Sequence, residues 1–124
     1  MGHIVMVVED DAFLLKAYQL KLTSAGFTVL SATDGVEALE LLKTEKPEII
    51  LLDLVMPRMD GFATLAEIKK QPALQSIPII VASNLGQDDE ISRVKAMGAI
   101  DFITKSDLSM SDLVAKLNTV LGEK

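Results

Sequence analysis

Apolar and polar residues follow one another along the chain in a pattern that predicts five strands, each followed by a helix. Most of these strands are short, almost wholly apolar runs, which are typical of strands buried on both faces of a parallel sheet. In chain order the predicted strands are Ile4–Val8, Thr28–Ala32, Glu48–Leu52, Ile77–Ala82 and Ile100–Thr104. Parallel strands of this kind need helices on both sides of the sheet to cover them.

The segments between the strands carry the apolar spacing and the end signals of helices. Leu14, Tyr18 and Leu22 recur at the spacing of one helix face. Asp34 and Glu37 have the spacing of a capping box, which predicts a helix that starts beside them. The remaining helices are predicted over Gly61–Gln71, over Asp88–Met97 and after Ser109, with Asp11, Asp60 and Ser109 as caps.

Five strand–helix units favour one fold. They are too few for an eight-stranded barrel, so we expect a doubly wound α/β fold with a five-stranded parallel sheet and right-handed crossovers. Residues 1–124 are expected to form a single domain. Open sheets of this kind bind ligands at the carboxyl ends of their strands.

Ionisable or hydroxyl side chains stand at the ends of four predicted strands. Carboxylates are the ligands that hard cations prefer, and hydroxyl and ammonium groups suit phosphoryl oxygens. The pattern therefore predicts a divalent-cation site that also takes a phosphoryl group. The residues are Glu9-Asp10-Asp11, Asp53, Ser83 and Lys105.

Asp53 is the candidate nucleophile of this site. A carboxylate at the end of a buried strand can attack phosphorus and form an acyl phosphate. Its charge repels an anionic donor, and Mg²⁺ between the carboxylate and phosphoryl oxygens would remove that repulsion. Glu9, Asp10 and Asp53, with a backbone carbonyl, are the expected metal ligands. Lys105 is expected to pair with Asp53 or a phosphoryl oxygen, and Ser83 to donate a hydrogen bond to another phosphoryl oxygen.

Charge and composition narrow the classes of function. The chain has 18 acidic and 12 basic residues, a net charge of −6, which argues against direct nucleic-acid binding. It has no cysteine, which excludes disulfides and thiolate metal sites. Its apolar runs are far shorter than the roughly 20 residues needed to span a bilayer, and no secretory signal is visible. We therefore expect a cytoplasmic domain without membrane contact.

Four segments of the chain together form a specific pattern. They are Val7-Val8-Glu9-Asp10-Asp11, Asp53-Leu54-Val55-Met56-Pro57-Arg58-Met59-Asp60-Gly61, Ser83 and Lys105. In this pattern the chain resembles the receiver domain of two-component response regulators.

The resemblance implies a flavodoxin-like sheet of strand order 2-1-3-4-5 with five helices. It also implies a phosphoryl group received from a sensor histidine kinase or phosphotransfer protein, and a downstream effector domain or protein as partner. It implies no enzyme beyond self-catalysed phosphoryl acceptance and slow autodephosphorylation.

The resemblance also implies a role for each residue of the metal and phosphoryl site. Asp53 would be the phosphoacceptor. Asp10 would bind Mg²⁺ directly, and Glu9 would bind the metal or one of its waters. The Val55 backbone carbonyl would be a further metal ligand.

A switch is implied at the neighbouring strands. Ser83 would move toward the phosphoryl group, and the rotamer of Phe102 would follow. Lys105 would be drawn in with them, and the face of the fourth helix, fifth strand and fifth helix would change shape. A phosphorylation-dependent homodimer would use the same face. The candidate partner contacts there are Ile91, Val94, Lys95 and Met97.

Several positions depart from the usual family pattern or vary within it. Ser106 follows Lys105 where the family usually has proline, often after a cis bond. A non-proline cis bond costs about 2.5–4 kcal/mol, so we expect either a trans bond with a rearranged loop or a cis bond held by local contacts. Asn84 stands where alanine is more common and would restrict donor access. Val55 and Leu85 are apolar positions that flank the site and would exclude water, which predicts slow autodephosphorylation.

Three alternatives stay open at this point. A magnesium-dependent phosphatase or phosphotransferase of the haloacid dehalogenase type would need an acid two residues after the nucleophile, where Val55 stands. A degenerate receiver would act as a phosphorylation-independent interaction module, for which Ser106 is the main support. A nucleotide-binding module would need glycine-rich phosphate motifs that the sequence lacks. The sequence is compatible with a single-domain regulator and with part of a longer one.

Overall fold

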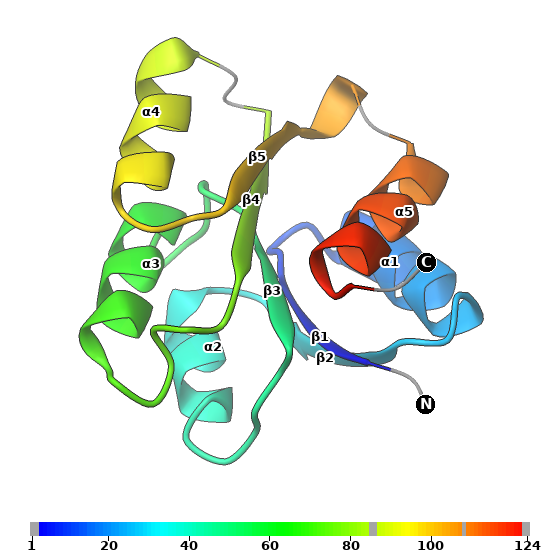
Figure 1. Cartoon of the computed structure of the whole chain (residues 1–124), viewed down its shortest axis with the longest axis horizontal. Coiled ribbons are helices and arrows are strands. Elements are labelled where there is room, and N and C mark those ends of the chain that lie inside the picture. Colours follow the sequence, from blue (N-terminus) through cyan, green and yellow to red (C-terminus); the bar gives the residue numbers. More distant parts are fainter. Residues whose placement is uncertain (1–2, 85–86, 108, 123–124) are drawn as a thin grey trace.

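The chain folds around one parallel sheet. The computed structural model describes residues 3–84, 87–107 and 109–122. The strands pair in the order β2-β1-β3-β4-β5, which confirms the predicted doubly wound α/β fold (Figure 1). They are β1 (Ile4–Val8), β2 (Thr28–Ala32), β3 (Ile49–Leu52), β4 (Ile79–Ser83) and β5 (Asp101–Thr104).

Within the described residues, five α-helices cover the sheet. They are α1 (Ala12–Ser24), α2 (Gly35–Leu41), α3 (Gly61–Lys70), α4 (Asp88–Ala96) and α5 (Met110–Val120). Helices α1 and α5 lie on one face, and α2, α3 and α4 lie on the other (Figure 1). None of the helices in the described ranges is long and apolar enough to cross a membrane. The predicted caps are confirmed at Asp11, Asp34, Asp60 and Ser109, each of which accepts a backbone N–H.

Alternating side chains along the strands build a core on each face of the sheet. In β1, Met6 and Val8 belong to the core under α2, α3 and α4. Val5 and Val7, which point the other way, belong to the core under α1 and α5. The sheet is thus buried on both faces, as its apolar strands predict.

The strand register brings the predicted site residues to one edge. The last residues of β1 and β3 are paired, so Glu9 and Asp53 leave the sheet side by side. Ser83 at the end of β4 pairs with the last residue of β5, and Lys105 follows directly. The carboxyl edge therefore collects side chains that lie far apart in the sequence.

Two side chains lie differently from the expectations. The prediction that Val94 contacts a partner is wrong, because its side chain faces inward on α4 and is fully buried. In α1, Leu15 rather than Leu14 joins Tyr18 and Leu22 in the buried face, and Leu14 packs at its margin.

The segment after β5 differs from the predicted loop. It forms a short 3₁₀-helix, η1 (Lys105–Asp107), which the sequence did not predict. The described residues contain no cis peptide bond. Of the two expected alternatives for Lys105–Ser106, the structure therefore has the trans bond, with η1 as the rearranged loop.

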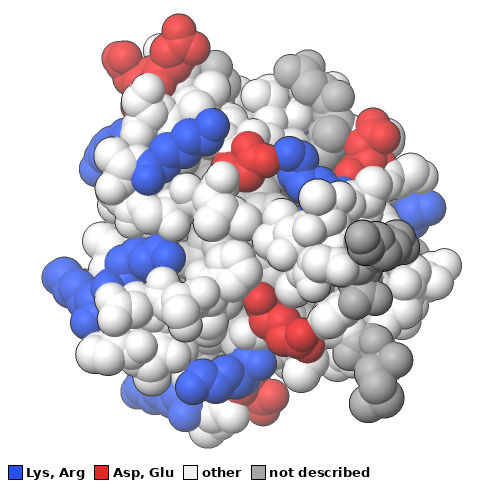
Figure 2. All heavy atoms as spheres, in the orientation of Figure 1, with Lys and Arg blue, Asp and Glu red and all other residues white. Residues whose placement is uncertain are grey.

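Basic side chains gather on one part of the face shown in Figure 2. Lys and Arg side chains lie mainly over α3 and α4 and along the lower edge, whereas acidic side chains are scattered. Arg93 of α4 lies over the Phe62 ring of α3, 3.9 Å from its centroid, and Lys69 donates to the Gln75 carbonyl at 2.8 Å. Part of this positive charge therefore contributes to packing within the fold.

Candidate functional site

Three carboxylates meet at the carboxyl edge of the sheet. Glu9 and Asp10 follow β1 and Asp53 follows β3, and one oxygen from each lies within 4.8 Å of the others. Glu9 and Asp53 are buried, whereas Asp10 is exposed. Converging carboxylate oxygens suit Mg²⁺, and the exposed side can admit the waters that this ion keeps. The residues present therefore fit a hard divalent cation.

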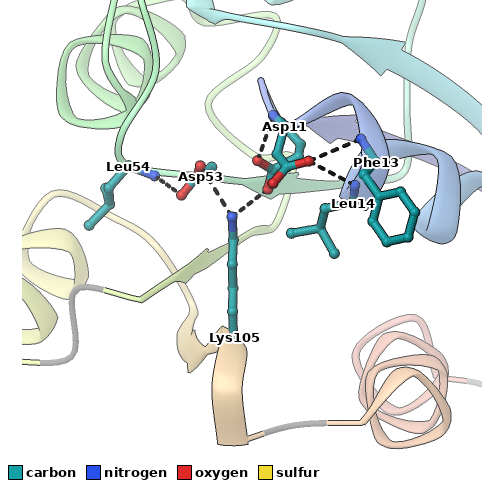
Figure 3. Close-up of polar contacts among 7 residues, drawn as sticks. Asp11, Phe13, Leu14, Asp53, Leu54 and Lys105 are labelled. Atoms are coloured by element: carbon teal, nitrogen blue, oxygen red, sulfur yellow. Dashed lines mark hydrogen bonds and ion pairs between the residues drawn. The ribbon is translucent and has the colours of Figure 1, made fainter.

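Lys105 reaches from the start of η1 toward Asp53 (Figure 3), and it also pairs with Glu9. Its Nζ donates to Glu9 Oε1 at 2.5 Å and lies 3.2 Å from Asp53 Oδ2. The sequence predicts a contact with Asp53 but not the shorter one with Glu9. The ammonium group thus lies between two of the three acids.

Backbone N–H groups hold the other oxygen of each buried carboxylate. The Leu54 N–H donates to Asp53 Oδ1 at 2.8 Å (Figure 3). The Asp11 N–H donates to Glu9 Oε2 at 3.1 Å. Asp11 itself uses its carboxylate to cap α1 and does not join the cluster. These bonds orient the two buried carboxylates toward Lys105.

Burial and neighbouring charges shift the ionisation of this group. Burial raises the pKa of Glu9, and the Asp53 carboxylate adds to the rise, while hydrogen bonds from Lys105 and the Asp11 N–H oppose it. Burial also disfavours the Lys105 ammonium, but Glu9 and Asp53 outweigh that effect and raise the pKa of Lys105. Lys105 therefore stays protonated near neutral pH and offsets part of the negative charge.

A hollow beside Asp53 collects further predicted residues. Asp53, Val55, Ser83, Asn84 and Lys105 line it. Ser83 is buried at the end of β4, whereas Val55 is 59% exposed. Phe102 packs from β5 against the core under α4 and does not line this hollow. Leu85, the other predicted apolar flank, lies outside the described residues.

Gly61 explains part of the long motif that follows β3. A Cβ atom there would lie 2.2 Å from the Asp53 carbonyl oxygen and 2.6 Å from Leu54 Cα. The Gly61 N–H donates to the Leu54 carbonyl at 2.9 Å, and Asp60 caps α3 through the Ala63 N–H at 2.8 Å. The Asp-Gly pair thus allows α3 to start directly against the residue that carries the site carboxylate.

The sequence did not predict an ion pair that involves the loop after β3. Arg58 Nε donates to Asp34 Oδ2 at 2.7 Å, which joins the loop after β3 to the start of α2. The sequence predicts Asp34 as a helix cap only and gives Arg58 no role. The two residues are 24 positions apart, so no local pattern could have paired them.

The family of the chain follows from a comparison with known proteins. Residues 5–118 match the response regulator receiver domain family. This match covers most of the chain, and the observed strand order is the one that the resemblance implied. The chain therefore belongs to this family, the receiver domains of two-component response regulators.

Individual relatives agree with this assignment. The probable transcriptional regulator ycf27 of Guillardia theta is 36% identical over 118 residues, 94% of this chain and 44% of that protein. The receiver domain of the Francisella response regulator 1452 has a TM-score of 0.90 and 28% identity, with 98% of both chains covered. The phosphorylated cyanobacterial phytochrome response regulator RcpA has a TM-score of 0.83 and 30% identity, over 97% of this chain and 91% of that chain. This chain spans less than half the length of the ycf27 protein.

Proposed function

We propose that the chain is a phosphoacceptor domain in which Asp53 takes a phosphoryl group with Mg²⁺ as cofactor. The observation that carries this proposal is the convergence of Glu9, Asp10, Asp53 and the Lys105 ammonium at one edge. The carboxylates of Glu9, Asp10 and Asp53 and the carbonyl of Val55 would hold the metal. RcpA, a structural neighbour, is known in a phosphorylated form, which supports the same chemistry here.

Phosphoryl transfer would proceed by attack of an Asp53 carboxylate oxygen on phosphorus. The bond from phosphorus to the histidine nitrogen of the donor breaks, and an acyl phosphate forms on Asp53. Bound Mg²⁺ supplies charge neutralisation between the carboxylate and phosphoryl oxygens. Lys105, 3.2 Å from Asp53 Oδ2, can pair with a phosphoryl oxygen. Ser83 lines the same hollow and can donate its hydroxyl to another.

The phosphoryl donor is expected to be a sensor histidine kinase or a phosphotransfer protein in the cytoplasm. Phe13 at the start of α1 is 88% exposed, and Val55 beside Asp53 is 59% exposed. Aromatic side chains such as Phe13 are enriched at protein interfaces, and the buried core of an interface is more apolar than its rim. They offer the donor protein apolar contacts at the start of α1 and beside Asp53.

Phosphorylation is expected to change the face formed by α4, β5 and α5. Ser83 would move toward the phosphoryl group, and Phe102 on the adjacent strand would change its rotamer. Asp101 of β5 pairs with Lys116 of α5 at 2.5 Å, so β5 and α5 are linked across this face. A downstream effector domain or protein, or a second copy of the chain, would distinguish the two states by differential affinity.

Intact-mass measurement with acetyl phosphate and Mg²⁺ tests the proposal. The wild type should gain the mass of one phosphoryl group, and neither Asp53→Asn nor a sample with EDTA should gain it. Asp60→Asn is the matched control, because Asp60 lies in the same loop and asparagine preserves the helix cap. A gain in Asp53→Asn would overturn the role of Asp53. No gain in the wild type, together with no Mg²⁺ binding, would favour a phosphorylation-independent interaction module.

A further inference from the structure

The loop between β3 and α3 contains Val55, whose carbonyl is an expected metal ligand. The Gly61 N–H fixes the first part of this loop through the Leu54 carbonyl. Mg²⁺ demands near-ideal octahedral geometry, so a backbone carbonyl serves as its ligand only where the loop is held in place. The contacts that hold the second part of the loop therefore affect the metal site.

Arg58 has an unusual backbone conformation in this second part. Its φ is 63°, and among the described residues no other residue except glycine has a positive φ. The Met59 N–H donates to the Pro57 carbonyl at 2.7 Å and closes a three-residue turn around Arg58. Residues with a Cβ disfavour this region of φ. Contacts outside the turn must therefore stabilise it.

Asp34 provides such a contact from the start of α2. Asp34 is only 4% exposed. Oδ1 accepts the Glu37 N–H at 2.9 Å as the cap of α2, and Oδ2 accepts Arg58 Nε at 2.7 Å. The adjacent Gly35 N–H donates to the Met59 carbonyl at 3.3 Å. The start of α2 thus holds the turn through one side chain and one backbone contact.

We propose that the Arg58–Asp34 ion pair positions the Val55 carbonyl for the divalent cation. This inference rests on the proposed function and adds the contact that holds one of its ligands. Val55 lies between two fixed points of the loop, the Gly61 N–H contact and the turn at Arg58. Arg58 and Asp34 are positioning residues, because neither belongs to the carboxylate cluster.

The direction in which the Mg²⁺ affinity changes when Arg58 is removed distinguishes a positioning role from a purely electrostatic one. Arg58 is a cation, so its removal would leave Mg²⁺ binding unchanged or tighten it if only charge mattered. If Arg58 positions a ligand, its removal weakens Mg²⁺ binding. Asp34→Asn preserves a good helix cap, but its carboxamide must then turn its NH₂ group toward Arg58 and cannot accept the hydrogen bond.

The test compares Mg²⁺ dissociation constants of the full chain by calorimetric titration. Arg58→Gln and Asp34→Asn should each weaken binding by about tenfold, the low end of the loss for groups that orient metal ligands. The double variant should bind no more weakly than the weaker single variant, because both changes break one contact. Lys70→Gln is the control, since it removes the same charge from the exposed Lys70–Glu67 pair and should not change the affinity.

Two outcomes of the binding measurement would overturn the inference. If the wild type binds Mg²⁺ and Arg58→Gln binds it equally or more tightly, the positioning role fails while the proposed function stands. If the wild type binds no Mg²⁺, both fail. Amide hydrogen exchange over residues 54–59, of which all but Pro57 have an amide hydrogen, is a second measurement that needs no metal. Faster exchange in Arg58→Gln and Asp34→Asn supports the inference, and unchanged exchange overturns it.

Discussion

Lys105 contacts Glu9 more closely than it contacts Asp53, at 2.5 Å against 3.2 Å. Burial disfavours the ionised form of Glu9, and the hydrogen bond from the Lys105 ammonium group opposes this effect. Lys105 therefore stabilises the ionised carboxylate. A divalent cation bound at Glu9 Oε1 would compete with Lys105 for the same oxygen. Such competition would leave the ammonium for Asp53 or for the phosphoryl group that it carries.

Replacement of Lys105 by methionine tests this relationship. Lys105→Met keeps much of the side-chain volume but leaves the buried Glu9 carboxylate without its cation. We expect a loss of about 1–3 kcal/mol in the free energy of unfolding at neutral pH, measured by urea denaturation with EDTA. Mg²⁺ binding, measured by calorimetry, should become tighter because no ammonium competes for Glu9.

The control for this change is Lys70→Met. Lys70 pairs with Glu67 at an exposed position, and such pairs contribute less than about 1 kcal/mol. Equal losses of unfolding free energy in the two variants would show that the Lys105–Glu9 contact contributes nothing beyond a surface ion pair.

Acid should weaken the fold partly through Asp34. The hydrogen bond from Arg58 and the Glu37 N–H hold the pKa of Asp34 below its ordinary value of 3.8. A carboxyl group with a depressed folded pKa stabilises the fold above its unfolded pKa, and this contribution is lost as the pH falls through the folded value. Asp34→Asn should therefore flatten the decline in unfolding free energy below about pH 4.

Urea denaturation across the acidic range measures this effect. Arg58→Gln should flatten the same part of the curve, because it removes the main cause of the pKa shift. A decline as steep as that of the wild type in both variants would contradict the assignment.

Local patterns predicted most of the fold. β1 and β2 have the predicted boundaries. In β1 the reason is plain, because the apolar run Ile4–Val8 lies between polar His3 and Glu9. Asp11 and Asp34 were recognised as caps because capping depends on neighbours three residues away. Val94 was predicted to be exposed, but it is buried. The packing of α4 on the sheet decides which face of this short helix is buried, and the sequence of the helix alone does not show it.

The positions of the site residues followed from the strand ends, and the contact of Lys105 with Asp53 was predicted, but the closer contact of Lys105 with Glu9 was not. Parallel strands place Glu9, Asp53 and Lys105 at one edge whatever their separation in sequence. Lys105 and Glu9 are 96 positions apart, and their contact depends on the direction in which η1 starts. No periodicity or capping signal records that direction.

Replacement of Gly61 by alanine tests the close approach of α3 to the site. A Cβ atom at Gly61 would lie 2.2 Å from the Asp53 carbonyl oxygen, so the helix or Asp53 must move. We expect a loss of about 1–3 kcal/mol in unfolding free energy and weaker Mg²⁺ binding. Urea denaturation and calorimetric titration measure the two effects.

Gly26→Ala separates backbone strain from displacement of the site. Gly26 follows α1 with φ +98° and has nothing within 4 Å of an added Cβ. Its replacement should lower stability through strain alone and leave the Mg²⁺ affinity unchanged. If Gly61→Ala also bound Mg²⁺ with wild-type affinity, the packing of α3 would have no role in the site.

The apolar side chain of Val55 should prolong the life of the acyl phosphate. Val55 lines the hollow beside Asp53 and offers no group that could orient an attacking water. Val55→Asn adds a carboxamide there and should speed phosphoryl loss about tenfold, below the roughly 10²–10⁴ of a well-placed general base. Intact mass followed over time after removal of acetyl phosphate gives the rate of phosphoryl loss.

The control is Ile100→Asn, which adds the same carboxamide at an exposed apolar position before β5. Its acyl phosphate should decay at the wild-type rate. Equal decay in Val55→Asn, or wild-type decay within seconds, would contradict this role of Val55.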